Sequence, residues 1–195
     1  MAYSVSSSDA NCYPNTTVLV NKLGLQKQEA LDEAERIAVT LRSVELENAE
    51  YYGPFTFEYY CKLHRHLFSD IYEWAGTLRT IDLSKKGTNF YPAERLLELG
   101  TALFDRLQKH HEFCGLPKNE YAREIAEFYH DLNMLHPFRE GNGRTQRLFF
   151  SLLVQRSGYQ VDFSQFDRDV LMMATIYAAQ GIMDYLIDFW TVALY

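Results

Sequence analysis

The amino-acid sequence predicts an all-α domain that carries one short β-hairpin. Long stretches have apolar residues at helical spacing, one short stretch alternates instead, and Gly and Pro residues separate them. At 195 residues the chain fits one domain with a sizeable core. No internal repeat or low-complexity linker divides it. We therefore expect a single domain over residues 1–195, with a core at about 20–190 and a loose leader at 1–17.

Helical patterns account for most of the chain. They cover residues 28–47, 56–68, 93–111, 120–134, a stretch from the end of the 136–143 loop to about 156, 167–179, and 182–194. Pro137 should stop the fourth helix. Asn119 is expected to cap the start of that helix, and Gly158 to follow the end of the next one.

The only stretch with a β pattern is Thr80–Tyr91. Ile81 and Leu83 alternate with polar residues, and a turn-forming segment with Gly87 comes next. Alternation followed by turn residues is typical of a short hairpin.

Composition and charge limit the function and the compartment. The net charge of −7 argues against a direct nucleic-acid partner, which would need a basic face. No apolar run approaches the roughly 18 residues of a membrane span, and the polar N-terminus does not resemble a signal peptide. Three scattered cysteines form neither a disulfide framework nor a zinc motif. The sequence thus indicates a cytoplasmic protein.

The segment from residue 136 to residue 147 carries the chemistry. Gly141 and Gly143 flank Asn142 just before a helix, an arrangement typical of a backbone cradle for an anion. The first N–H groups of the helix and its dipole favour phosphate there. Arg144 and Arg147 lie three residues apart, so their guanidinium groups can face the same phosphate chain.

Two further side chains complete this segment as a transfer site. Glu140 would repel a phosphate in the cradle unless a cation lay between them, and Mg²⁺ commonly bridges one carboxylate and phosphates. His136 has a pKa suited to accepting a proton near neutral pH. His64 and His66 are two residues apart on a helix and cannot chelate one metal, so we expect surface or satisfied polar roles for them.

The same segment resembles a known signature. His-Pro-Phe-Arg-Glu-Gly-Asn-Gly-Arg-Thr-Gln-Arg at 136–147 matches the whole Fic motif, His-x-Phe-x-(Asp/Glu)-Gly-Asn-Gly-Arg-x-x-Arg. The stretches 63–68 and 71–76, with Arg79, are similar to the helix and turn upstream of that motif, and 81–90 is similar to the family's flap hairpin. The resemblance covers about residues 20–190.

Membership of the Fic family implies transfer of AMP from Mg-ATP to a Ser, Thr or Tyr hydroxyl of a target protein, with release of pyrophosphate. By this resemblance His136 deprotonates the hydroxyl, and Glu140 holds Mg²⁺ on the α- and β-phosphates. The backbone of 141–143 cradles those phosphates, Arg144 reaches the β-phosphate side and Arg147 the γ-phosphate. Phe138 anchors the loop.

The flap is expected to position the target. By the same resemblance it pairs its main chain with an extended target segment. Its residues are Lys85, Lys86, Gly87, Thr88, Asn89, Phe90 and Tyr91.

The resemblance also raises the question of an inhibitor. Ser43 to Asn48 fits Ser/Thr-x-x-x-Glu-Gly/Asn, the family's inhibitory pattern, in which Glu47 would pair with Arg147. The alternative is that Glu47 belongs to the acidic last turn of the first core helix, which is the interpretation we favour. We then expect inhibition by a separate small antitoxin.

Small single-domain members often act as bacterial toxins on targets such as type II topoisomerases, which makes a toxin or effector the expected role. Two alternatives stay open at this point. One is another reaction on the same scaffold: transfer of UMP or phosphocholine, or removal of AMP. The intact Arg147 favours a triphosphate donor over phosphocholine. The other is an inactive target-binding module from a secreted effector.

Overall fold

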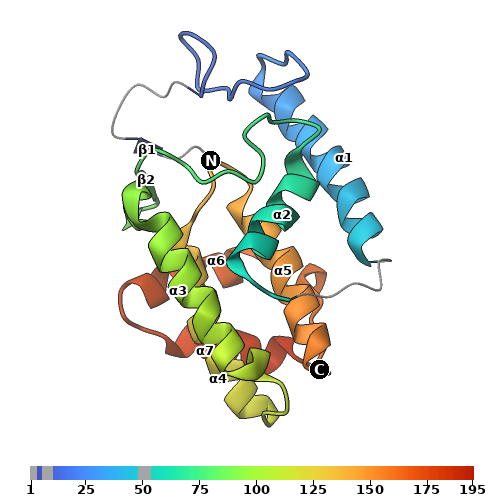
Figure 1. The fold of residues 1–195 in the computed structure, drawn as a ribbon, viewed down its shortest axis with the longest axis vertical. Coiled ribbons are helices and arrows are strands. Elements are labelled where there is room, and N and C mark those ends of the chain that lie inside the picture. The colour runs from blue at the N-terminus through green and yellow to red at the C-terminus, as the bar shows by residue number, and fades with distance from the viewer. Residues whose placement is uncertain (1–3, 6–10, 48–53) are drawn as a thin grey trace.

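The computed structural model describes residues 4–5, 11–47 and 54–195, and these form a mostly helical domain (Figure 1). The α-helices are α1 (Gln28–Glu47), α2 (Phe57–Phe68), α3 (Leu96–Lys109), α4 (Lys118–Leu135), α5 (Asn142–Arg156), α6 (Arg168–Ala179) and α7 (Asp184–Ala193). Short 3₁₀ turns are η1 (Ala93–Arg95), η2 (His111–Phe113) and η3 (Phe163–Gln165). The predicted fold class and the order of helices are confirmed.

The ends of the helices follow from local chemistry, with one correction. The hydroxyl of Thr56 accepts from the backbone of Tyr59 and caps α2. Gly158, at φ +84°, directly follows the C-cap of α5, as predicted. The prediction for Asn119 was wrong: α4 begins at Lys118, so Asn119 lies inside its first turn. Pro117 is the cap residue instead, and its carbonyl accepts the first helical hydrogen bond.

The flap is an antiparallel hairpin of β2 (Leu83–Lys85) and β3 (Thr88–Asn89), as predicted. A strand that was not predicted, β1 (Ser4–Val5), pairs antiparallel with β2 and makes a three-stranded sheet. Its residues lie within the leader that we expected to be loose. The outer edge of β2 offers unpaired N–H and C=O groups. An extended segment such as β1 can form hydrogen bonds to them even though its sequence carries no strong strand pattern.

Helix α4 is central and contacts α3, α5, α6 and α7. Its buried face packs into a cluster of aromatic rings, where Phe104 meets Phe128 and Phe149 edge to face. Because α4 and α5 are both fixed in this core, the loop that joins them has a defined position. No helix in the described part of the chain is long and apolar enough to cross a membrane.

Candidate active site

The loop between α4 and α5 begins at His136, which terminates α4 in a left-handed conformation (φ 42°, ψ 59°). A non-glycine residue rarely adopts this conformation unless its surroundings enforce it. The packing of Phe138 helps to hold His136 in this conformation. Its ring is fully buried, and it stacks on His64 at a centroid distance of 3.8 Å and on Tyr60 at 5.5 Å. The predicted anchoring role of Phe138 agrees with this packing.

Asn142 and Gly141 close the loop. The Asn142 amide accepts from the Phe138 N–H at 2.9 Å and donates to the Phe138 carbonyl at 2.7 Å. Gly141 has φ +81°, and a Cβ built on it would lie 2.5 Å from the Phe68 ring. Only glycine satisfies both conditions.

Gly143 differs from Gly141. It lies in the first turn of α5 without a positive φ, and the nearest atom to a Cβ at this position would be an Arg147 nitrogen at 3.6 Å. Unlike Gly141, Gly143 therefore contributes no strained backbone to the predicted cradle. Gly143 is exposed and lies on the cavity wall, where a side chain would instead occupy the space above the helix N-terminus.

His136 is buried, and its ring has a defined tautomer. Nδ1 lies 3.2 Å from the Asn133 carbonyl, which can only accept a hydrogen bond, so Nδ1 carries the proton and Nε2 the lone pair. The Phe90 ring stacks on the imidazole at a centroid distance of 3.7 Å. Burial lowers the pKa of His136 to about 3 against the opposing Asn133 hydrogen bond, and the positive charges of Lys85 and Arg79 lower it further. The imidazole is neutral at physiological pH.

Glu140 lies beside the cradle. Its carboxylate accepts from the Gly141 N–H at 2.8 Å, and the buried His64 holds the Glu140 carbonyl at 2.9 Å. Because the Gly76 N–H donates to Nδ1 of His64, Nε2 carries the ring proton and donates to Glu140. His64 is thus a satisfied core histidine, as expected. It positions the loop through a hydrogen bond between residues 76 apart in sequence.

The residues around Glu140 fit a magnesium ion that binds together with phosphates. Among the described residues, no group of three His, Cys, Asp or Glu side chains could hold a metal alone. Mg²⁺ in nucleotide sites is usually bound by one or two carboxylates plus phosphate oxygens and water. A single carboxylate next to a helix N-terminus meets that requirement.

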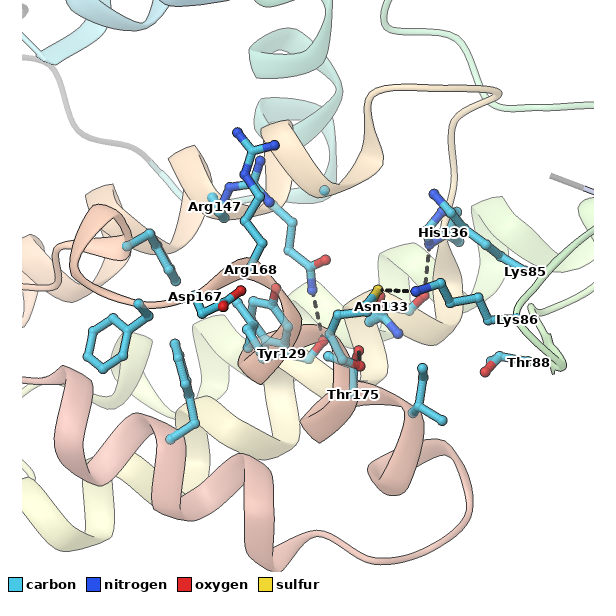
Figure 2. Close-up of a pocket in the computed structure, with 18 of the residues that line it drawn as sticks. Lys85, Lys86, Thr88, Tyr129, Asn133, His136, Arg147, Asp167, Arg168 and Thr175 are labelled. Carbon is cyan, nitrogen blue, oxygen red and sulfur yellow. Dashed lines mark hydrogen bonds between the residues drawn. The ribbon is translucent and has the colours of Figure 1, made fainter. Parts of the chain in front are cut away.

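A cavity of about 450 Å³ opens between the flap, α4, α5 and α6 (Figure 2). This volume lies within the roughly 300–1,000 Å³ typical of small-molecule sites. Four cations line the cavity, Lys85, Lys86, Arg147 and Arg168, against one carboxylate, Asp167. A chain with net charge −7 thus presents a locally positive cavity, which favours an anionic ligand.

Figure 2 shows His136 on one side of this cavity and Arg147 with Arg168 on the other. Burial lowers the pKa of Arg147, and the charges of Arg168 and Arg144 act in the same direction. Among the described residues, no carboxylate pairs with Arg147. Arg168 was not predicted from the sequence, because it follows an ordinary helix cap, Asp167, and matches no motif.

Arg144 points away from this cavity, toward α1. Its guanidinium forms an ion pair with Glu35, packs over the Phe68 ring at 4.7 Å, and lies 3.6 Å from the Glu140 carboxylate. Tyr72 donates a hydrogen bond to Glu35, whose residue surface is only 5% exposed. Burial raises the pKa of Glu35, although Arg144 and Tyr72 oppose that shift and Glu140 adds to it. Glu35 was not predicted from the sequence, because it matches no motif of chemistry-bearing residues.

Arg79 was part of the family resemblance without an assigned role, and the structure shows what its side chain holds together. Its buried side chain donates to the carbonyls of Ile81 at 2.6 Å, Tyr91 at 2.5 Å, His136 at 2.8 Å and Leu135 at 3.5 Å. The guanidinium therefore ties the chain on both sides of the flap hairpin to the end of α4. At the flap tip, the Lys86 ammonium lies 2.7 Å from the Met172 sulfur of α6, so the tip extends across the cavity.

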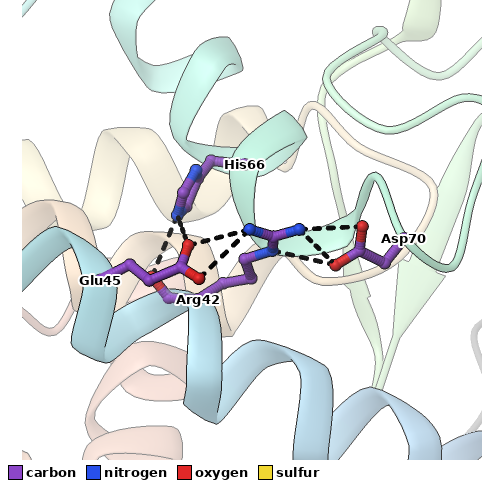
Figure 3. Close-up of polar contacts among 4 residues, drawn as sticks. All are labelled: Arg42, Glu45, His66 and Asp70. Atoms are coloured by element: carbon purple, nitrogen blue, oxygen red, sulfur yellow. Dashed lines mark hydrogen bonds and ion pairs between the residues drawn. The ribbon is translucent and has the colours of Figure 1, made fainter.

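The segment that carries Ser43 lies on α1, which packs along α2 (Figure 1). A surface cluster holds its last turns there (Figure 3). Arg42 pairs with Glu45 at 2.9 Å and with Asp70 at 2.8 Å, and His66 lies 3.4 Å from Glu45. Ser43 is not among the residues that line the cavity, and the side chain of Glu47 lies outside the described part of the chain.

The fold and the site together define a helical domain in which a tightly packed loop leads into the N-terminus of α5, with a neutral, buried histidine at the start of that loop. The Fic/DOC family model matches residues 54–154. The chain belongs to the Fic/DOC family.

Similar proteins support this placement. "Probable protein adenylyltransferase y4lH" of Sinorhizobium fredii is 36% identical over 89% of this chain and 89% of its own length. "Protein adenylyltransferase VbhT" of Bartonella schoenbuchensis is 34% identical over 91% of this chain. The chain spans 37% of the length of that relative. The crystal structure of the BepC effector of Bartonella tribocorum with bound AMPPNP superposes with a TM-score of 0.89, at 27% identity, over 95% of this chain and 96% of that one.

Proposed function

We propose that this chain transfers AMP from ATP to a hydroxyl side chain of a target protein and releases pyrophosphate. By homology within the Fic/DOC family, its class is protein adenylyltransferase. One observation carries the reaction: the neutral His136 and the cation Arg147 line the same cavity, on opposite sides, next to the N-terminus of α5. The AMPPNP bound by the BepC structure supports a nucleoside triphosphate as donor.

In this mechanism the target hydroxyl gives its proton to Nε2 of His136, while its oxygen bonds to the α-phosphorus. The bond from the α-phosphorus to the bridging oxygen breaks, and pyrophosphate leaves. The low pKa keeps His136 deprotonated before reaction, and the negative phosphates raise its proton affinity once they lie nearby. Asn133 fixes the tautomer that this step requires.

The remaining groups bind and orient the donor. The N–H groups of Asn142 and Gly143 in the first turn of α5 lack intrahelical partners and can donate to phosphate oxygens. Arg147 neutralises the terminal phosphate. Arg144 points toward α1 in this structure and would serve the β-phosphate side with the guanidinium nitrogens that Glu35 does not hold. Glu140 would hold Mg²⁺ against the phosphates, where the ion neutralises their charge and polarises the phosphoryl group.

The flap would hold the acceptor segment by main-chain pairing, through residues Lys85 to Phe90. Because β1 already pairs with the outer edge of β2, the acceptor adds at β3 or displaces β1. We also propose that a separate small antitoxin supplies a carboxylate to Arg147, since that guanidinium has no such partner among the described residues. A type II topoisomerase in the bacterial cytoplasm is the target class to test first.

The test is label transfer in bacterial lysate from ATP, GTP, UTP and CTP with magnesium, followed by mass spectrometry of the labelled proteins. We expect AMP on a hydroxyl residue. His136→Ala should lose about 10²–10⁴ in rate while AMPPNP affinity stays within a few-fold, and Glu140→Ala should lose the gain in affinity from magnesium. Transfer by His136→Ala at the wild-type rate, or label from another nucleotide alone, would contradict this function.

A further inference from the structure

Glu35 is a buried acid that the mechanism above does not use. It lies on α1, outside the loop and the cavity, and its side chain is 7% exposed. Such a charge is costly unless it is paired and hydrogen-bonded. Here Arg144 supplies the charge and Tyr72 the hydrogen bond.

Glu35 and Glu140 share one nitrogen of Arg144. Nη2 pairs with Glu35, while the Glu140 carboxylate lies at 3.6 Å from the same atom. That second distance is beyond hydrogen-bonding range, so Arg144 favours Glu35. Glu140 lies in the loop two residues before the start of α5, and Arg144 lies in the first turn of that helix, so a rotation of the arginine side chain could close the gap.

We infer that Glu35 is a positioning residue for the transfer reaction: it holds Arg144 off Glu140 and so keeps the Glu140 carboxylate available to magnesium. This inference rests on the proposed function, because it assigns the use of Glu140. The Phe68 ring under the guanidinium and the Tyr72 hydroxyl on Glu35 fix the arrangement from two sides. Arg144 keeps its other nitrogens for phosphate oxygens.

Removing the charge of Glu35 should change how nucleotide binding depends on magnesium, and simple destabilisation of the fold would not do so. In Glu35→Gln, Arg144 closes on Glu140 and neutralises it. Without magnesium, the nucleotide then meets less repulsion and binds more tightly than in the wild type. With magnesium, the ion must compete with Arg144 for the carboxylate. The affinity gained from magnesium should shrink by roughly tenfold, the worth of one charge-assisted contact.

Calorimetric titration of AMPPNP, with and without magnesium, measures this gain on the folded protein. Glu33→Gln is the matched control, because Glu33 lies on the same helix, is exposed and pairs only locally with Arg36. It should show the wild-type gain. Tyr72→Phe, which leaves all charges in place, should shrink the gain in the same direction as Glu35→Gln but less. Thermal unfolding shows whether each variant is folded. If Glu35→Gln does not fold, the magnesium gain of Tyr72→Phe decides the test instead.

The outcomes separate the two ideas. A magnesium gain in Glu35→Gln equal to that of the wild type overturns this inference alone, as does an equal loss of affinity with and without magnesium. Tighter binding with magnesium would mean that Glu35 withholds Arg144 from the nucleotide, which also overturns it. If the wild type itself gains nothing from magnesium, the metal role of Glu140 fails and this inference fails with it.

Discussion

Phe90 on the flap controls the base, and its removal should change the proton affinity of His136. The ring stacks almost parallel to the imidazole, at 3.7 Å and 7°. Burial is the largest cause of the shift of the His136 pKa from 6.5 to about 3. Phe90→Ala opens one face of the imidazole to water. We expect the pKa to rise by roughly one to two units, or about 1.4–2.7 kcal/mol, while the charges of Lys85 and Arg79 keep it below 6.5.

The sign of the linked stability effect follows from the same shift. Between pH 6.5 and 3 the unfolded chain binds a proton at this histidine that the native protein does not. The wild type therefore loses stability as the pH falls through this range, and Phe90→Ala should lose less from this source.

An NMR titration of the histidine ring signals measures the pKa directly, and His136→Ala identifies the signal. Asn89→Ala is the control, because Asn89 is exposed at the neighbouring strand position. It should leave the midpoint unchanged. A His136 midpoint in Phe90→Ala within about half a unit of the wild-type value would refute the argument that this ring shields the base.

Two further perturbations test the surroundings of the site. Arg79→Lys replaces a planar guanidinium that donates to four carbonyls by a single ammonium. We expect the free energy of unfolding, measured in urea, to fall by about 2–4 kcal/mol. Transfer to the protein target should also slow by more than the change in AMPPNP affinity explains. Glu47→Gly should change transfer by less than about fivefold, or one kcal/mol, measured with purified enzyme and by toxicity on expression in bacteria.

The helices and the flap were predictable because their signals are local. Period, alternation and turn residues mark them over a few positions each. The segment 136–147 was equally visible, since its chemistry is contiguous in sequence. Strand β1 was not, because two residues without a pattern gain their structure only from the edge of β2. The start of α4 was misplaced by the choice of Asn119 over Pro117 as the cap, a difference of two residues that helix propensity does not resolve.

The supporting residues were hidden for a different reason. Arg79, Glu35 and Arg168 act on the loop or the cavity from other elements, and their neighbours in sequence carry no related chemistry. A buried acid on α1 has the same appearance in sequence as its exposed neighbour Glu33. Only tertiary packing separates the two, because it brings Arg144 and Tyr72 to one of them.

The geometry of α1 is the reason for expecting little from Glu47. It lies twelve residues after Glu35, which is about 18 Å along the helix axis and roughly a third of a turn away in direction. Glu35 already faces Arg144, and Arg147 is one helical turn further along α5. The pairing of Arg42 with Asp70 holds the last turns of α1 beside α2 (Figure 3), so we expect a movement of the Glu47 end toward Arg147 to be unfavourable. Toxicity or target labelling by Glu47→Gly alone, beside an inactive wild type, would show that α1 does make this movement and that the chain carries its own inhibitor.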